Sequence, residues 1–384
     1  DVALMKKMGL KSYRFSVSWS RILPNGTEKI NQKGIEFYQS LVRELKAAGI
    51  EPMVTLYHWD LPYALYLQGG WKNPQIPDWF AAYTKIVVEA LSDQVQYWMT
   101  LNEPQCFVGI GHLQGRHAPF LDEPASLRPV TRHVLLAHAK AVQTIRQYAK
   151  LPPKVGYAPT GPVFSPCGDE SEAAIAEAYR RTMEVEGCYS ISWWCDPVLL
   201  GRVPEPMAKA LGADVFTPQE LELLHQPLDY LGFNVYNACA AQQPGSEYTA
   251  NTWQGSPRTA MEWPITPDCI YWAIRFLNQR YGRPILITEN GMANTDFVML
   301  DGKVHDPQRI DYVHRHLLAA RRTLQEGYPL IGYTYWSIMD NYEWAEGYSK
   351  RFGLIYVDYR TMERIPKDSA AWYAHVIATN GSEL

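Results

Sequence analysis

Two glutamates stand out because each follows an apolar run and precedes residues that break a strand. Glu103 comes two residues after the run Val95–Leu101, and Glu289 comes directly after Pro284–Thr288. A carboxylate at the end of a strand lies on the rim of a sheet, beyond the last hydrogen bonds of the ladder. Two such carboxylates suggest a pair with unequal pKa values, which is what cleavage of a glycosidic bond requires.

The elements that must position these carboxylates follow one pattern, in which predicted strands alternate with predicted helices. Gly34–Ala48 and Pro77–Ser92 carry apolar residues three and four apart, which is typical of a helix with one buried face. Apolar strands that alternate with helices predict a parallel sheet covered by helices. The predicted strands are Lys11–Ser16, Glu51–Leu56, Val95–Leu101, Lys154–Ala158, Tyr230–Val235, Pro284–Thr288 and Ile331–Trp336.

The start of the chain reads as the end of a helix. Val2, Met5 and Met8 are spaced three apart, and Gly9 is a helix stop. A closed parallel barrel needs eight strands, so we expect strand one and part of helix one to be missing from this chain. The predicted fold class is an α/β TIM (β/α)8 barrel with seven visible strands, in a single catalytic domain over residues 1–384.

Composition argues against nucleic acid and membrane partners, and it leaves open the role of the many aromatic residues. The 384 residues carry a net charge of −4, which is not basic enough for a phosphate backbone, so we expect no nucleic acid partner. No apolar run is long enough to span a membrane, so we expect no membrane partner. The 13 Trp and 25 Tyr fit either a large core or a site where aromatic faces stack on sugars.

Cysteine and histidine spacing argues against disulfides and metals. The six cysteines form no C-x-x-C pair and are irregularly spaced, which favours thiols in a reducing, cytoplasmic compartment. Two His pairs, His112/His117 and His133/His138, are five residues apart, the wrong spacing for one helix face, so no metal site is expected. Phosphate loops, nucleotide-binding glycine turns and serine nucleophile elbows are absent from the sequence, and we expect no cofactor.

Five motifs together resemble glycoside hydrolase family one, the family of β-glucosidases and related retaining β-glycosidases. The resemblance covers essentially the whole chain, with the motifs in the family's order. The motifs are Tyr13–Pro24 (YRFSVSWSRILP), Thr55–Pro62 (TLYHWDLP), Thr100–Pro104 (TLNEP), Ile287–Gly291 (ITENG) and Glu343–Tyr348 (EWAEGY).

The resemblance implies roles for the two glutamates and for two residues near them. It assigns Glu103 as the acid/base and Glu289 as the nucleophile of a retaining mechanism, with carboxyl groups about 5–5.5 Å apart. Arg14 and Tyr236 match the family residues that contact the nucleophile, and an arginine near a carboxylate keeps it ionised. An ordinary structural ion pair remains the alternative for Arg14, as does a core tyrosine for Tyr236.

The resemblance also implies a set of sugar-binding residues at the rim. His58 and Asn102 can hydrogen-bond ring hydroxyls, Glu343 can accept two hydroxyls at once, and two tryptophans offer a floor and a wall; core packing is the alternative for each tryptophan. Trp263 is a looser match on the leaving-group side. The implied substrate-binding residues are His58, Asn102, Trp336, Glu343 and Trp344.

Two functions of different class follow. The first is a retaining exo-β-glycosidase that hydrolyses terminal β-D-glucosyl residues, with β-galactosides or β-fucosides as secondary substrates, acting on a small-molecule glycoside or an oligosaccharide. The second is a truncated, inactive or carbohydrate-binding remnant of the same family. Both glutamates are present, which favours the enzyme, whereas the expected absence of strand one favours the remnant.

Overall fold

The computed structural model describes residues 1–241 and 255–384, and within them the chain forms two compact units. Unit 1 comprises Asp1–Lys11, Pro162–Thr182 and Asn234–Leu384, and unit 2 comprises Ser12–Gly161 and Met183–Phe233. Each unit is therefore built from separate stretches of the sequence. A single catalytic domain over residues 1–384 stays a prediction.

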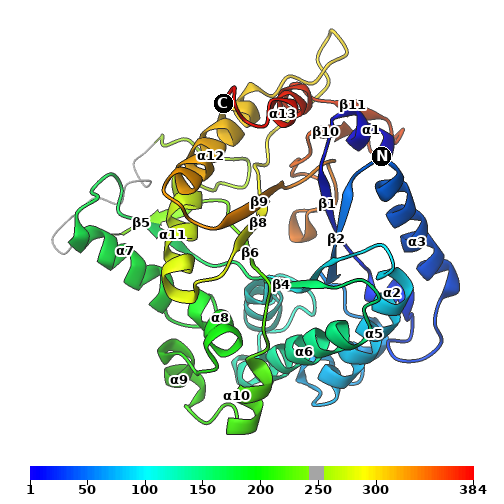
Figure 1. Cartoon of the computed structure of the whole chain (residues 1–384), viewed down its shortest axis with the longest axis vertical. Coiled ribbons are helices and arrows are strands. Elements are labelled where there is room, and N and C mark those ends of the chain that lie inside the picture. The colour runs from blue at the N-terminus through cyan, green and yellow to red at the C-terminus, as the bar shows by residue number, and fades with distance from the viewer. Residues whose placement is uncertain (242–254) are drawn as a thin grey trace. The chain divides into compact units, whose positions relative to one another are not determined.

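Unit 2 is organised around four parallel strands in chain order (Figure 1). Phe15 pairs with Val54, Val54 with Trp98, and Trp98 with Val155. Six of the seven residues of the second strand are buried, as expected for a parallel sheet covered on both faces. Four predicted strands are thereby confirmed, as β1 (Ser12–Ser16), β2 (Glu51–Tyr57), β3 (Tyr97–Asn102) and β4 (Lys154–Ala158).

Helices follow the strands of unit 2, and the two predicted ones are confirmed as α3 (Gln32–Ala47) and α5 (Ile76–Leu91). Tyr83 of α5 stacks on Trp19 with ring centroids 5.0 Å apart, and its hydroxyl donates to the carbonyl oxygens of Val17 and Leu56. These bonds fix α5 against the ends of β1 and β2. The other helices are α2 (Trp19–Ile22), α4 (Tyr63–Tyr66), η1 (Gly70–Lys72), η2 (Gln105–Leu113), η3 (Pro124–Ser126), α6 (Leu127–Tyr148), α8 (Ile191–Leu200), α9 (Glu205–Leu211) and α10 (Pro218–Leu224).

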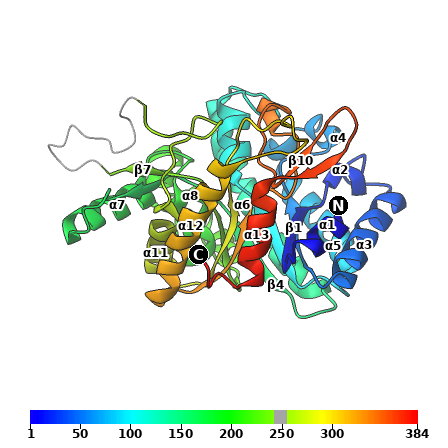
Figure 2. The same ribbon diagram turned by 90° about the horizontal axis from the view of Figure 1, so that it is seen from above.

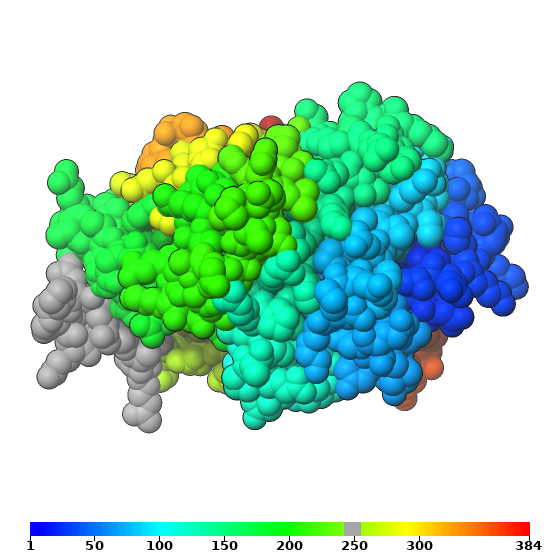
Figure 3. Space-filling model, turned by 90° about the horizontal axis from the view of Figure 1, so that it is seen from below, coloured from blue at the N-terminus to red at the C-terminus, as the bar shows by residue number. Residues whose placement is uncertain are grey.

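Parts of the connections that follow the strands of unit 2 reach its surface. Those between β2 and α6, coloured from blue to cyan, form one continuous part of the surface in Figure 3. Loops and strand ends of this kind commonly carry the functional residues of a parallel α/β protein, because the strands themselves form the rigid support.

Unit 1 contains a parallel pair of strands, β8 (Ile285–Asn290) and β9 (Leu330–Tyr335), in which Ile287 pairs with Tyr333. With β6 (Leu231–Asn234), which ends at the first residue of this part of unit 1, they complete the seven predicted strands. Helix α12 lies beside both α11 and α13 (Figure 1 and Figure 2). The remaining elements are α7 (Glu172–Glu184), α11 (Cys269–Tyr281), α12 (Pro307–Gln325), α13 (Asp368–Ala378), η4 (Trp344–Glu346), and the strands β5 (Val163–Ser165), β7 (Ala238–Ala240), β10 (Ile355–Val357) and β11 (Arg364–Pro366).

The predicted opening helix is confirmed as α1 (Val2–Lys7). Gly9 ends it in the left-handed region at φ 74° and donates its N–H to the carbonyl of Lys6. Met8 packs into a core cluster with Leu354, Ile355 and Ala370, which joins the first residues of unit 1 to its last helix. No helix among residues 1–241 and 255–384 is long and apolar enough to cross a membrane.

Candidate active site

Glu103 is a buried carboxylate at the carboxyl end of β3, with 7% of its surface exposed. Its N–H donates to the carbonyl of Ala158 at the end of β4 (2.8 Å), and its Oε2 accepts from Sγ of Cys106 (3.0 Å). Its φ of 41° lies in the left-handed region, which a residue before proline rarely adopts. Strain of this kind costs of order 1–3 kcal/mol and is found most often at functional sites.

The residue before Glu103 is the centre of a polar cluster in unit 2. Asn102, fully buried, accepts from Nη2 of Arg14 at its Oδ1 (2.6 Å), and its Nδ2 lies 3.2 Å from Nε2 of His58. Arg14 also donates from Nε to Oγ1 of Thr55 (3.1 Å), and Trp59 donates from Nε1 to the carbonyl of Asn102 (2.9 Å). The ends of β1, β2 and β3 therefore meet in one hydrogen-bonded group of side chains.

Asp60 is a titratable residue of the motif Thr55–Pro62, two residues after His58. Burial raises the pKa of Asp60 to about 6, against hydrogen bonds from Ser18 and its own turn and the positive charge of Arg21, which lower it. With this raised pKa, the carboxyl group of Asp60 changes its charge in the weakly acidic range. It lies two residues along the chain from His58, which belongs to the polar cluster around Asn102. The loop after β2 therefore carries a charge that depends on pH.

Glu289 is the second buried carboxylate, on β8 of unit 1, with 4% of its surface exposed. The hydroxyl of Tyr236 donates to its Oε2 at 2.6 Å, and the N–H of Val235 donates to its carbonyl at 3.0 Å. Tyr236 is held in turn, because the hydroxyl of Tyr312 donates to its carbonyl (2.7 Å) and Trp263 packs against its ring with centroids 5.1 Å apart. The carboxylate therefore meets its hydroxyl donor in a fixed geometry.

Asn290, the last residue of β8, fixes the neighbouring chain. Its Nδ2 donates to the carbonyl of Val235 (2.8 Å), and its Oδ1 accepts from the hydroxyl of Tyr333 (2.8 Å). Its carbonyl accepts the N–H of Trp336 (2.9 Å). At the next position a side chain is impossible without rearrangement, because a Cβ on Gly291 would lie 2.0 Å from the carbonyl oxygen of Trp336. These contacts place Trp336 directly beside the end of β8.

Glu343 and Trp344 lie on the loop after β9, and both are partly exposed. The N–H of Glu343 donates to the carbonyl of Gly347 (2.7 Å), and the N–H of Gly347 donates to the carbonyl of Trp344 (3.1 Å). Trp344 has a φ of 44°, again in the left-handed region. The backbone thus folds into a tight turn that leaves a carboxylate and an indole partly accessible to solvent.

The structure brings the predicted site residues together in two groups. Arg14, His58, Asn102 and Glu103 lie on neighbouring strands of unit 2, and Tyr236 bonds to Glu289 in unit 1. Trp336, Glu343 and Trp344 belong to unit 1 as well. The separation of the two carboxylates and the contact of Arg14 with Glu289 stay predictions.

Three supporting residues were not identified from the sequence. Cys106 bonds to Glu103, Trp59 bonds to Asn102, and Tyr312 bonds to Tyr236. The first could have been found, because a residue three positions along a helical turn faces back to its start. The bond of Tyr312 joins residues 76 positions apart, which no local pattern indicates.

Comparison with known proteins gives a consistent result. The sequence matches Glycosyl hydrolase family 1 over residues 1–382. It is 41% identical to Beta-glucosidase A of Thermotoga maritima, with 100% of this chain and 86% of the relative covered. It is 37% identical to the bifunctional beta-D-glucosidase/beta-D-fucosidase of Bifidobacterium breve, with the same coverage.

Solved structures agree. The chain superimposes on the Thermotoga maritima beta-glucosidase in complex with deoxynojirimycin with a TM-score of 0.89, at 40% identity, covering 99% of this chain and 86% of the other. The same values hold for the complex with glucoimidazole. Together with the parallel strands and their helices, this likeness confirms the predicted α/β TIM-barrel fold class.

Proposed function

The chain belongs to glycosyl hydrolase family 1, and on that premise we propose that it is a retaining exo-β-glycosidase that removes terminal β-D-glucosyl residues from small β-glycosides or oligosaccharides. The observation that carries the proposal is the buried carboxylate of Glu289, at the end of a parallel strand and bonded to the hydroxyl of Tyr236 at 2.6 Å. Nothing in the comparisons supports an inert or carbohydrate-binding remnant.

In the first step of this reaction, Glu289 attacks the anomeric carbon while Glu103 gives its proton to the departing glycosidic oxygen. The C–O bond to the aglycone breaks, and an ester forms between the sugar and Glu289. In the second step, Glu103 takes a proton from water, the water oxygen attacks the anomeric carbon, and Glu289 leaves as a carboxylate. The product keeps the β configuration because the carbon is inverted twice.

Sugar recognition in this proposal uses the five substrate-binding residues that the family resemblance implies. Asn102 and His58 bind ring hydroxyls, and their mutual contact at 3.2 Å supports a shared task. Glu343 accepts two hydroxyls, and Trp336 and Trp344 provide apolar faces; the partial exposure of all three supports access to a ligand. Unphosphorylated glucosides are the main substrates in this proposal, and β-galactosides or β-fucosides are secondary ones. A relative named as a bifunctional beta-D-glucosidase/beta-D-fucosidase supports the fucosides.

Labelling of the nucleophile tests the proposal. A 2-deoxy-2-fluoro-β-glucoside with a good leaving group should inactivate the enzyme and add one glycosyl mass to the peptide that contains Glu289, since fluorine slows hydrolysis of the ester. Glu326 offers a matched control, because it also accepts from a tyrosine hydroxyl, that of Tyr271 at 2.7 Å. Glu326→Gln should label normally and Glu289→Gln should not. Label on another residue, or an α-configured product, contradicts the assignment.

A cytoplasmic location is also part of the proposal, supported by the cysteine spacing alone. Fractionation of the cells that make the protein tests it. Activity on an aryl β-glucoside should be found in the soluble cell extract, and activity only in the culture medium contradicts it.

A further inference from the structure

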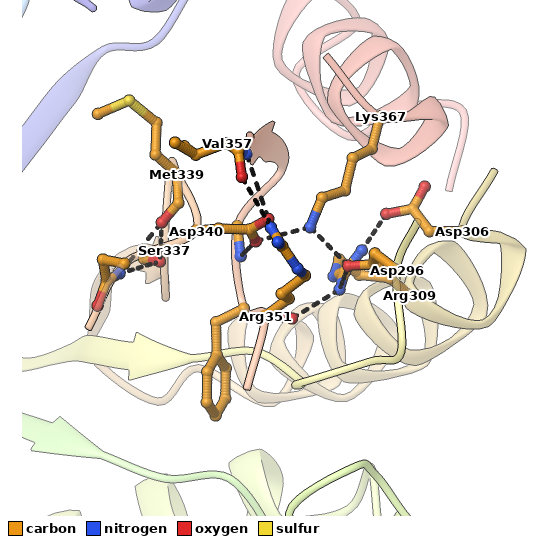
Figure 4. A network of polar contacts seen from close by, with 12 residues as sticks. Asp296, Asp306, Arg309, Ser337, Met339, Asp340, Arg351, Val357 and Lys367 are labelled. Carbon is orange, nitrogen blue, oxygen red and sulfur yellow. Dashed lines mark hydrogen bonds and ion pairs between the residues drawn. The ribbon is translucent and has the colours of Figure 1, made fainter. Parts of the chain in front are cut away.

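A buried network of charged side chains lies at the base of the loop that carries Glu343 and Trp344 (Figure 4). Five of its side chains are completely buried, and that of Arg351 is 15% exposed. Three carboxylates face three cations, so the network is balanced in charge. Its members are Asp296, Asp306, Asp340, Arg309, Arg351 and Lys367.

Asp340 closes the neck of this loop. Its Oδ2 accepts from Nη1 of Arg351 (2.6 Å), and its Oδ1 accepts from the N–H of Gly353 (2.9 Å). Residues 341–350 therefore form a loop whose two ends are tied to one carboxylate. The neck is tightly packed, because a Cβ on Gly353 would lie 2.1 Å from the backbone nitrogen of Asp340.

Lys367 joins this neck to the chain that follows Glu289. Its Nζ donates to Oδ1 of Asp340 (2.8 Å) and to Oδ2 of Asp296 (2.6 Å), so one ammonium bridges two carboxylates, as Figure 4 shows. Asp296 lies seven residues after Glu289. The segment that follows the expected nucleophile and the neck of the sugar-binding loop are thus connected through the buried ammonium of Lys367.

Arg309 of α12 strengthens the same connection. It donates from Nη2 to Oδ2 of Asp296 (2.6 Å) and to the carbonyl of Arg351 (3.0 Å), and it pairs with Asp306. The carbonyl of Arg351 also accepts the N–H of Asn294 (3.1 Å). Arg309 of α12 and the backbone of Asn294 therefore hold the carbonyl of Arg351, and Arg309 holds Asp296 as well.

We propose that the Asp296–Lys367–Asp340 bridge is a positioning device that sets where the loop of Glu343 and Trp344 stands relative to the end of β8. The three residues act on sugar recognition through the loop and do not touch the substrate. The inference rests on the proposed function, because it assumes that Glu343 binds the sugar. A network that served only general stability would have no reason to tie both ends of this one loop to the segment after Glu289.

The test uses a charge-balanced variant, because loss of one partner alone would leave a buried charge uncompensated and destabilise the fold. D296N/K367M removes one carboxylate and the bridging cation, and it leaves Asp340 with Arg351. The matched control is D311N/R315M, which removes an exposed pair on α12 (Arg315 Nε to Asp311 Oδ2, 2.8 Å) that should contribute little.

Three quantities separate positioning from stability. The fraction of competent sites is titrated with the 2-deoxy-2-fluoro-β-glucoside, and KM and kcat are measured on an aryl β-glucoside. D296N/K367M should raise KM about tenfold or more, the loss expected when hydrogen bonds to a charged group are misplaced. The control should leave all three quantities unchanged. A lower fraction of competent sites with unchanged KM would overturn the proposal.

A double-mutant cycle with Glu343 gives a sharper readout. Glu343→Gln should raise KM strongly in the wild type and much less in D296N/K367M, because there the side chain is already out of place. Additive effects would overturn the proposal. If D296N/K367M does not fold, D340N/K367M takes its place in the same cycle, since it also keeps the network balanced in charge and the amide oxygen can still accept from Gly353. Failure of the proposed function is distinct, because the wild type would then neither hydrolyse nor bind the fluorinated label.

Discussion

The hydroxyl of Tyr236 offers a direct way to test how the nucleophile is controlled. It donates to Oε2 of Glu289 at 2.6 Å, and its position is fixed by Tyr312 and Trp263, so Tyr236→Phe removes one hydrogen bond with little change in shape. During the first chemical step Glu289 gives up its negative charge to form an ester, and during the second step it regains that charge. The bond therefore weakens in the first step and strengthens in the second.

The size of the effect follows from the charge on the acceptor. A hydrogen bond to a charged group contributes about 1.5–3 kcal/mol, which corresponds to about a 10- to 150-fold change in rate. Tyr236→Phe should therefore slow hydrolysis of the glycosyl-enzyme by this factor. Since kcat on an activated aryl glucoside is then limited by the second step, kcat should fall, and KM should fall with it because the intermediate accumulates.

Pre-steady-state kinetics with a dinitrophenyl β-glucoside provide the assay. The variant should release a burst of aglycone equal to the number of sites, and its fluoroglycosyl adduct should turn over more slowly than that of the wild type. Tyr271→Phe is the matched control, because Tyr271 also donates to a glutamate, Glu326, at 2.7 Å. A fall in kcat/KM equal to the fall in kcat, or the same change in Tyr271→Phe, would refute the reasoning.

Three further predictions concern the acid/base, the substrate and acid stability. Glu103→Ala should reduce kcat/KM far more for alkyl glucosides than for activated aryl glucosides, and azide should restore activity and give a β-glucosyl azide; equal losses on both substrates would indicate a structural role. A 6-phosphoglucoside should have a lower kcat/KM than the plain glucoside, because Glu343 would repel the phosphate dianion, and a higher value would contradict this. Burial lowers the pKa of His138 from 6.5 to about 3, so below about pH 6.5 the unfolded chain binds a proton at this imidazole that the folded chain does not. The free energy of unfolding should therefore be highest above about pH 6.5 and should fall as the pH falls toward 3. Between pH 7.5 and pH 5, urea denaturation should show the free energy of unfolding of the wild type falling by about 2 kcal/mol more than that of His138→Gln, and an equal fall would show that this imidazole is not the cause.

The strands could be predicted from the sequence because their signal is local. A run such as Glu51–Tyr57 is mostly apolar, since both of its faces are buried, and it lies between the end of one helix and a polar turn. The carboxylates at strand ends were visible for the same reason. Strands of three residues, such as β5 and β7, are too short to show a period, and the sequence analysis did not identify them.

The supports of the site could not be predicted, because they join residues that are distant in sequence. Lys367 bonds to Asp296, 71 positions away, and Arg14 bonds to Asn102, 88 positions away. A lysine before a helix reads as an ordinary exposed residue, and nothing in its neighbours shows that its ammonium is buried between two carboxylates. Long-range pairs of this kind are fixed by the fold and not by a local pattern.

Each carboxylate has contacts within its own unit, and this has a consequence for how substitutions at those contacts should act. Glu103 depends on the carbonyl of Ala158 and on Cys106, all within unit 2. Glu289 depends on Tyr236 and on the chain around Asn290, all within unit 1. Catalysis by positioned groups needs each group fixed before the reaction begins. Substitutions in the support of Glu103 should therefore act mainly on leaving-group protonation. Those in the support of Glu289, which also holds Trp336, should change formation of the intermediate and sugar recognition together.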